Sequence, residues 1–144
     1  MAIDNERTDL PVIDSSTQPF WEAAREGVLL IRRCNACNEA FFYPRPFCPS
    51  CWSPDVGWEA ASGMGQVYTY SIVYSNDLPP FSGRLPYIAA VVDLDEGPRM
   101  MTNVVGCGVT DVHVGMRVTV AFEEETDEVT LPRFRPFGIP TELP

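Results

Sequence analysis

Alternation of apolar and polar residues runs through the second half of the chain and predicts β-strands there. The longest alternating stretch is Gln66–Tyr74, with its tyrosines and Ile72 on one face and smaller residues on the other. Four further stretches have strand character: Tyr87–Leu94, Arg99–Val105, Met116–Phe122 and Val129–Phe134. The turn Asp95-Glu96-Gly97-Pro98 predicts a hairpin. Five short strands without a long helix favour a small Greek-key barrel of the OB type, although a small sandwich would show a similar strand count.

The first half of the chain has a different pattern. Phe20–Glu26 is apolar on one side, follows capping hydroxyls and Pro19, and stops at Gly27, so it predicts a short helix. Val28–Arg33 and Ala40–Tyr43 predict two short strands. Residues 1–14 show no period and indicate either a flexible tail or an arm that orders on a partner. The chain is therefore expected to be mainly β, with regions at 1–27, 28–62 and 63–144.

Four cysteines lie in two matched pairs around these first strands: Cys34, Cys37, Cys48 and Cys51. Two residues separate the members of each pair, so both sulfurs of a pair can face one ion. Four thiolates suit tetrahedral zinc and leave no position for a substrate water, so we expect a structural zinc ribbon. Iron in the same geometry stays open. Disulfides need an oxidising compartment and no signal peptide is recognisable, while a redox motif would occur once, at the start of a helix.

Charge and composition narrow the functional classes. The chain has 20 acidic against 10 basic residues, a formal charge of −10, which disfavours nucleic acid as a partner. Its hydrophobic content of 45% predicts a globular fold. No apolar run approaches the length of a membrane span, so we expect a cytoplasmic protein without membrane contact. The acidic run Glu123–Glu125 lacks the spacing of a cation site and is interpreted as a solvated turn.

Nearly the whole chain, from about residue 19 to 136, resembles a family of small bacterial and archaeal proteins. Its members join an N-terminal helix, a rubredoxin-like zinc ribbon and a C-terminal OB fold. The resemblance is carried by Pro19-Phe20-Trp21, Gly27, the two cysteine pairs, Phe42-x-Pro44-Arg45, Gly65-x-Val67-Tyr68-Thr69, Pro86-Tyr87, Gly115-Met116-x-Val118 and Pro132-Arg133-Phe134-x-Pro136. Asn38, after the first cysteine pair, stands where the family more often has glycine.

This resemblance implies a non-catalytic or co-catalytic accessory subunit of a thiolase-like enzyme. Such enzymes carry out acyl transfer or retro-aldol cleavage of CoA thioesters, including those of steroid side chains. The family implies that the ribbon helps to dock the partner and that the barrel surface lies near the route of the CoA thioester. We expect two copies on a thiolase-like dimer. The expected partner and CoA-thioester surface is Phe81, Arg84, Tyr87, Arg133, Phe134 and Phe137, with Phe20 and Trp21 also expected at an interface.

The sequence allows three other interpretations of the function. As a stand-alone enzyme the chain would have to use its one histidine, His113, or Cys107, and we interpret these as a surface residue and a small packed hydrophobe. A nucleic-acid-binding protein would stack bases on Tyr68, Tyr70, Tyr74 and Phe81 and contact phosphates with Arg133 and Arg135. We instead expect the tyrosines to fill a barrel face and the arginines to flank the last strand. A stand-alone acyl-CoA carrier would bind the phosphates and the acyl chain with two sets of residues: Arg84, Arg99, Arg133 and Arg135 for the former, and Phe81, Tyr87, Phe134 and Phe137 for the latter.

Overall fold

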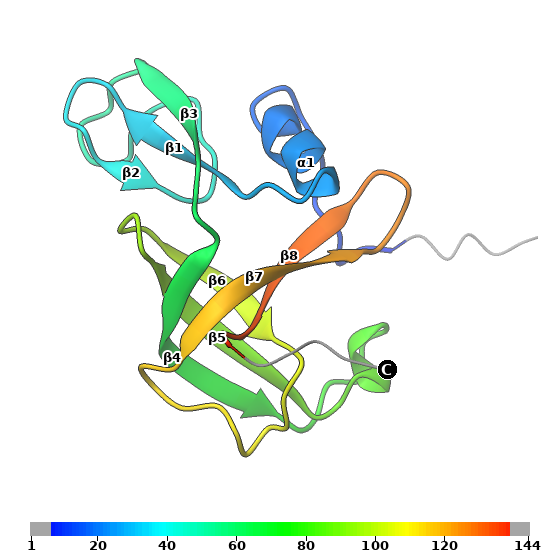
Figure 1. Ribbon diagram of the computed structural model, residues 1–144. Helices are drawn as coiled ribbons and strands as arrows, with labels where there is room; N and C mark the ends of the chain where they lie inside the picture. The colour runs from blue at the N-terminus through cyan, green and yellow to red at the C-terminus, as the bar shows by residue number, and fades with distance from the viewer. Residues whose placement is uncertain (1–6, 139–144) are drawn as a thin grey trace, which may run out of the picture.

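The computed structural model, described here for residues 7–138, combines one helix, a three-stranded sheet and a closed five-stranded barrel (Figure 1). The elements in chain order are α1 (Gln18–Arg25), β1 (Leu30–Cys34), β2 (Ala40–Phe41), β3 (Val56–Ala60), β4 (Met64–Val73), the 3-10 helix η1 (Phe81–Gly83), β5 (Tyr87–Leu94), β6 (Arg99–Val104), β7 (Arg117–Glu124) and β8 (Thr130–Pro136). No helix within these residues is long and apolar enough to cross a membrane.

The barrel follows from the alternating pattern of its strands. Along β5, residues Ile88, Ala90, Val92 and Leu94 are buried and their neighbours are half-buried. The strands close in the order β4-β5-β6-β8-β7, all pairs antiparallel except β6 with β8. The closed order confirms the OB-type barrel and excludes a sandwich. The backbones of β4 and β5 approach each other closely at Gly65, where an added Cβ would lie 2.5 Å from the carbonyl oxygen of Asp93.

One face assignment on β4 is wrong. The register against β5 shifts between Val67 and Thr69, which marks a β-bulge, so the period of two does not continue along the strand. Val67 is fully buried, whereas Tyr68, Tyr70 and Tyr74 are exposed to solvent. The tyrosines therefore lie at the surface and do not fill the barrel.

The small sheet places β1 between β2 and β3, with both pairs antiparallel. β3 was not expected from the sequence, because Val56-Gly57-Trp58-Glu59 shows no alternation and lies half-buried. Pairing from Leu30↔Ala60 to Cys34↔Val56 holds this strand in place. Trp58 is covered by the guanidinium of Arg32, whose carbon lies 4.0 Å from the ring centroid.

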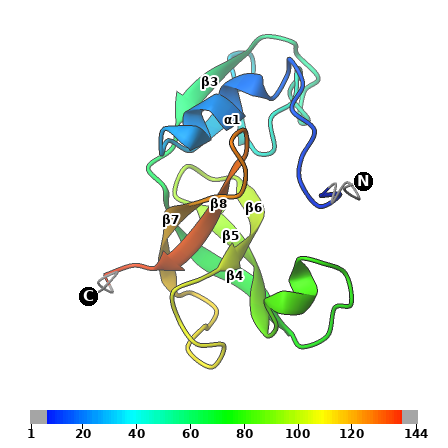
Figure 2. The same cartoon turned by 90° about the vertical axis from the view of Figure 1, so that its right-hand side faces the viewer.

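Helix α1 lies between the small sheet and the β7–β8 hairpin of the barrel (Figures 1 and 2). Phe20 and Trp21 are 1% and 5% exposed, and their rings meet edge to face with centroids 4.8 Å apart. The indole nitrogen of Trp21 donates a hydrogen bond to the hydroxyl of Tyr43 at 2.9 Å. The expectation that Phe20 and Trp21 face a partner is therefore wrong. Both side chains instead pack within the chain itself, because an eight-residue helix is stable only when its apolar side is covered.

Candidate metal centre and barrel pocket

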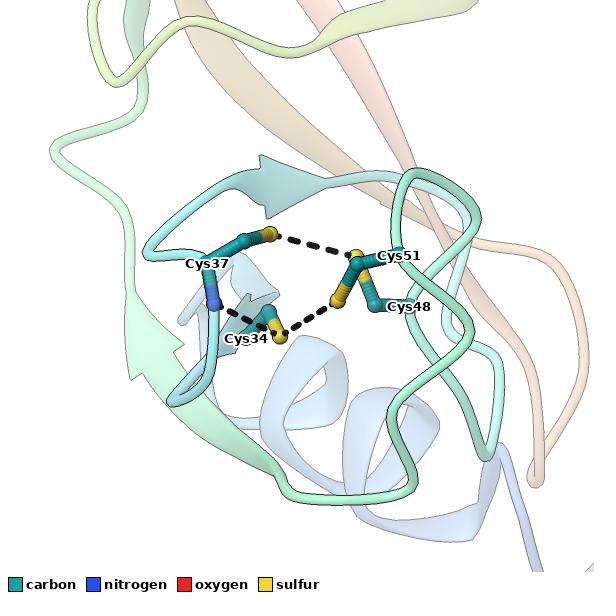
Figure 3. Close-up of side chains that lie close together, drawn as sticks. All are labelled: Cys34, Cys37, Cys48 and Cys51. Atoms are coloured by element: carbon teal, nitrogen blue, oxygen red, sulfur yellow. Dashed lines mark hydrogen bonds between the residues drawn. The ribbon is translucent and has the colours of Figure 1, made fainter.

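The four paired cysteines converge at the end of the small sheet (Figure 3). Cys34 ends β1, Cys37 lies in the turn that follows, and Cys48 and Cys51 belong to the loop before β3. All four sulfurs lie within 4.8 Å of one another. Among the described residues, these four cysteines are the cluster of potential metal ligands close enough together to hold one ion.

The sulfur spacing fits a tetrahedral ion. The Sγ atoms of Cys34 and Cys51 are 3.5 Å apart, and those of Cys37 and Cys48 are 3.7 Å apart. Zinc–sulfur bonds of about 2.3 Å in a tetrahedron require sulfur–sulfur edges of about 3.8 Å, so little adjustment is needed. Cys34 and Cys48 are buried, while Cys37 and Cys51 are exposed.

The two cysteine pairs have matching backbone turns. The amide nitrogens of Asn38 and Trp52 donate to the carbonyl oxygens of Cys34 and Cys48, at 2.9 and 2.8 Å. Asn38 and Trp52 each have φ of 67°, which is the left-handed conformation. Asparagine tolerates this conformation, so the departure from glycine at position 38 leaves the turn intact.

Backbone amides favour the thiolate form of the inner cysteines. The amides of Cys37 and Ala36 donate to the sulfur of Cys34 and hold the pKa of that thiol below its ordinary value. Burial raises the pKa of Cys48, but the amides of Cys51 and Ser50 outweigh it and lower the pKa to about 7. Burial and the neighbouring sulfurs raise the pKa of the outer thiols, Cys37 and Cys51. Since a metal binds the thiolate, the backbone prepares the two inner cysteines for an ion.

A second feature is a pocket of about 380 Å³ at one end of the barrel. It is lined by the loop that carries η1, the start of β5, the end of β6 with the residues that follow it, the end of β7 and the middle of β8. Figure 2 shows η1 and its loop standing beside the barrel. The apolar part of the lining is Phe81, Pro86, Tyr87, Ile88, Val104, Val105, Cys107 and Val109, and the polar part is Arg84, Asn103, Glu123, Glu125 and Arg133.

Four of the six residues expected at a CoA-thioester surface meet in this pocket, namely Phe81, Arg84, Tyr87 and Arg133. Phe81 and Tyr87 pack with ring centroids 6.1 Å apart. The other two do not line it. Phe137 is exposed beyond the end of β8, and Phe134 is 0% exposed inside the barrel. Phe134 cannot present its ring to a partner, because the alternation along β8 turns it inward.

The sequence reasoning missed the acidic side of the pocket. Arg133 donates a hydrogen bond to Glu123 at 3.1 Å. Arg84 and Arg7 donate to the same Oε1 atom of Glu125, at 3.1 and 3.0 Å. The side chain of Glu125 is 9% exposed, so this part of the run is not a solvated turn. Burial raises the pKa of Glu125, but the hydrogen bonds from Arg7 and Arg84 outweigh it and hold the pKa below its ordinary value. The sequence alone does not set Glu125 apart from its neighbours in the acidic run, because its arginine partners lie more than 40 positions away.

The remaining candidates lie apart from a catalytic arrangement. His113 is exposed, and within residues 7–138 neither it nor Cys107 makes a side-chain hydrogen bond. Burial and the nearby carboxylate of Asp111 raise the pKa of the Cys107 thiol. Arg99, considered for phosphate binding, instead covers the ring of Tyr68 at 3.6 Å and pairs with Asp93 at 2.7 Å.

Comparisons with known proteins agree with this architecture. Two protein-family models match consecutive parts of the chain: the ChsH2 rubredoxin-like zinc ribbon domain at residues 21–57 and the ChsH2 C-terminal OB-fold domain at residues 58–123. A solved structure described as an Ltp2-ChsH2(DUF35) aldolase has a chain that is 39% identical, with a TM-score of 0.78. That match covers 88% of this chain and 98% of the other.

Two curated relatives differ in length. A probable enoyl-CoA hydratase alpha subunit of Thermomonospora curvata is 39% identical over 132 residues, which is 92% of this chain and 40% of that protein. A DUF35 domain-containing scaffold protein of Methanocaldococcus jannaschii is 36% identical over 104 residues, 71% of this chain and 73% of that protein. With its cysteine cluster, its closed barrel and these relatives, the chain belongs to the DUF35 family of ChsH2-type zinc-ribbon and OB-fold proteins.

Proposed function

We propose that this chain is an accessory subunit of a thiolase-like enzyme that acts on a CoA thioester. The ribbon holds one structural zinc ion and contributes to docking, and the barrel pocket faces the thioester. Retro-aldol cleavage of a steroid side chain and acyl transfer are both reactions that such a partner performs. A cytoplasmic complex of two accessory chains on a thiolase-like dimer is the assembly we favour.

The observation that carries the proposal is the pocket. It gathers four side chains from two distant segments, 81–87 and 133, which we expected at a CoA-thioester surface. The names of the relatives support a CoA-acting complex, since one solved structure is described as an Ltp2-ChsH2(DUF35) aldolase, one relative as a probable enoyl-CoA hydratase alpha subunit and one as a scaffold protein. The match to nearly the full length of the aldolase complex's chain supports an accessory chain of this size.

An accessory role also agrees with the chemistry of the described residues. A nucleophile needs a base within hydrogen-bond reach, and the Cys107 thiol has a raised pKa and no such neighbour. The chain itself therefore supplies shape and binding, and we assign bond cleavage to the partner. Four thiolates fill the coordination of a zinc ion, so the metal would hold the fold of residues 30–60 and would leave no open position for a substrate.

Co-expression with a thiolase-like protein encoded beside this chain tests the proposal. We expect the two proteins to elute together and the complex to turn over an acyl-CoA substrate. Phe81→Ala removes a pocket wall and should lower this turnover, whereas Leu78→Ala, in the same loop but outside the pocket lining, should not. Separate elution together with full activity of the partner alone would overturn the accessory role.

A nucleic-acid-binding role has one observation in its favour, the exposure of Tyr68, Tyr70 and Tyr74. The net charge of −10 opposes it, and Arg99, which covers the ring of Tyr68, is already paired with Asp93. A mobility-shift assay at low salt should therefore show no binding.

A further inference from the structure

The charged groups around the barrel pocket are already paired with one another. Arg84 and Arg133 are its two basic residues, and each donates to a pocket glutamate: Arg84 to Glu125 and Arg133 to Glu123, both at 3.1 Å. Arg133 also donates to the amide oxygen of Asn103 at 2.8 Å. The formal charge of the lining is therefore zero, with two arginines against two glutamates.

One partner of each pair is shielded from solvent. The side chains of Glu125 and Arg133 are only 9% and 13% exposed, whereas those of Arg84 and Glu123 are 38% and 41% exposed. Arg7 from the N-terminal arm donates to the same Glu125 oxygen as Arg84. An anion that took either guanidinium from its glutamate would leave that carboxylate without this partner. The excess of acidic residues over the whole chain adds further repulsion.

The rest of the pocket is apolar. Phenylalanine, proline, isoleucine and valine side chains line it, and its volume of about 380 Å³ lies within the range of small-molecule sites. An apolar lining whose charged groups are paired with one another favours an uncharged hydrocarbon group. It disfavours phosphate groups, because these would need free guanidinium groups.

We propose that the pocket binds the hydrocarbon part of the acyl thioester and rejects the anionic phosphates at its other end. Naming the thioester rests on the proposed function. The preference for uncharged over anionic ligands is a property of the chain's own residues and can be measured without a partner. It also reverses the role considered for Arg84 and Arg133 in an acyl-CoA carrier, since these residues neutralise the two pocket glutamates and do not bind phosphate.

Cys107 provides the readout, because it lines the pocket and is the one cysteine outside the metal cluster. The zinc-loaded full-length chain is alkylated with iodoacetamide in the presence of 1-decanol or decanoate, two probes with the same carbon chain but different charge. Peptide mass spectrometry follows the rate at Cys107, and calorimetry follows binding. At a decanol concentration about ten times its dissociation constant, mass action predicts alkylation to slow about tenfold. Decanoate at the same concentration should leave the rate unchanged.

A double variant tests the cause of the preference. Glu123→Gln with Glu125→Gln frees both pocket arginines, so decanoate should gain protection of Cys107 in this variant. Glu128→Gln, an exposed change in the same acidic region but outside the pocket lining, should behave as wild type. Thermal melts confirm that each variant is folded before it is compared.

Each outcome decides the matter. Equal protection by decanoate and decanol in the wild type, or protection by neither, overturns the inference. Loss of decanol binding when a thiolase-like partner is added would show that a partner side chain fills the pocket, and this also overturns it. Selective decanol protection in a chain that forms no complex would support the inference while refuting the accessory role, so the two failures are distinguishable.

Discussion

Phe134→Ala should destabilise the barrel strongly. The ring is 0% exposed and lies on β8, which is held between β6 and β7, opposite Val104 on one side and Val120 on the other. Truncating a buried phenylalanine to alanine typically costs about 3–5 kcal/mol, because apolar contacts are lost and a cavity remains. We expect the upper half of this range, since a closed barrel paired on both sides of β8 cannot collapse onto the cavity.

Thermal unfolding measures this effect. For a domain near 150 residues, each kcal/mol shifts the melting temperature by about 2–4 °C, so a loss in the upper half of the range should lower the melting temperature of Phe134→Ala by about 8–20 °C. The metal content should stay at the wild-type value, because the four cysteines belong to the separate small sheet.

Phe137→Ala is the matched control. This ring is 57% exposed, and surface substitutions of this kind usually change stability by no more than about 0.5 kcal/mol. A melting temperature for Phe134→Ala within 2 °C or so of the control would refute the inward orientation of Phe134, given the size of the expected shift. Phe134→Leu, which keeps most of the buried volume, should recover much of the loss.

Three further predictions concern the metal, pH and catalysis. Cys48→Ser should lose the metal by elemental analysis and increase amide hydrogen exchange in β1 and β3, because so small a sheet depends on its ion; full retention of the metal would contradict the cluster. The folded-state pKa of Glu125 lies below its ordinary value, so its stabilising effect is present above about pH 4.5 and is lost as the pH falls through the folded pKa. Glu125→Gln should therefore melt below wild type near neutral pH, with a gap that closes on acidification, and a constant gap would refute the linkage. Cys107→Ala and His113→Ala should leave the turnover of a reconstituted complex within a few-fold of wild type, whereas a loss of about a hundredfold with the complex intact would make that residue catalytic.

The strands and the metal ligands were predictable because each depends on local spacing. Alternation marks β5 from its first to its last residue, and paired cysteines two residues apart are recognisable without a structure. β3 escaped prediction because its pairing with β1 holds a stretch that has no alternation of its own. The tyrosines around β4 were misassigned because alternation does not show a bulge: Tyr68 lies where the register shifts, and Tyr74 follows the end of the strand.

The pocket was only half predictable. Its aromatic and basic residues stood out by type, but their charge balance depends on Glu123, Glu125 and Arg7, which are far from Arg84 in sequence. An acidic run in a turn is usually solvated, and only tertiary structure shows which carboxylate is shielded. The prediction that Phe20, Trp21 and Phe134 lie at an interface failed for a related reason. A sequence shows that an aromatic side chain must be covered, but it does not show whether a partner or the chain itself covers it.

The accessory role is tested most directly by titrating a purified thiolase-like partner with this chain and measuring acyl-CoA turnover. We predict that activity rises from a low basal value and reaches its plateau at one chain per partner subunit, the ratio of a two-plus-two complex. A partner that is fully active alone, with turnover unchanged across the titration, would contradict the role proposed for this chain.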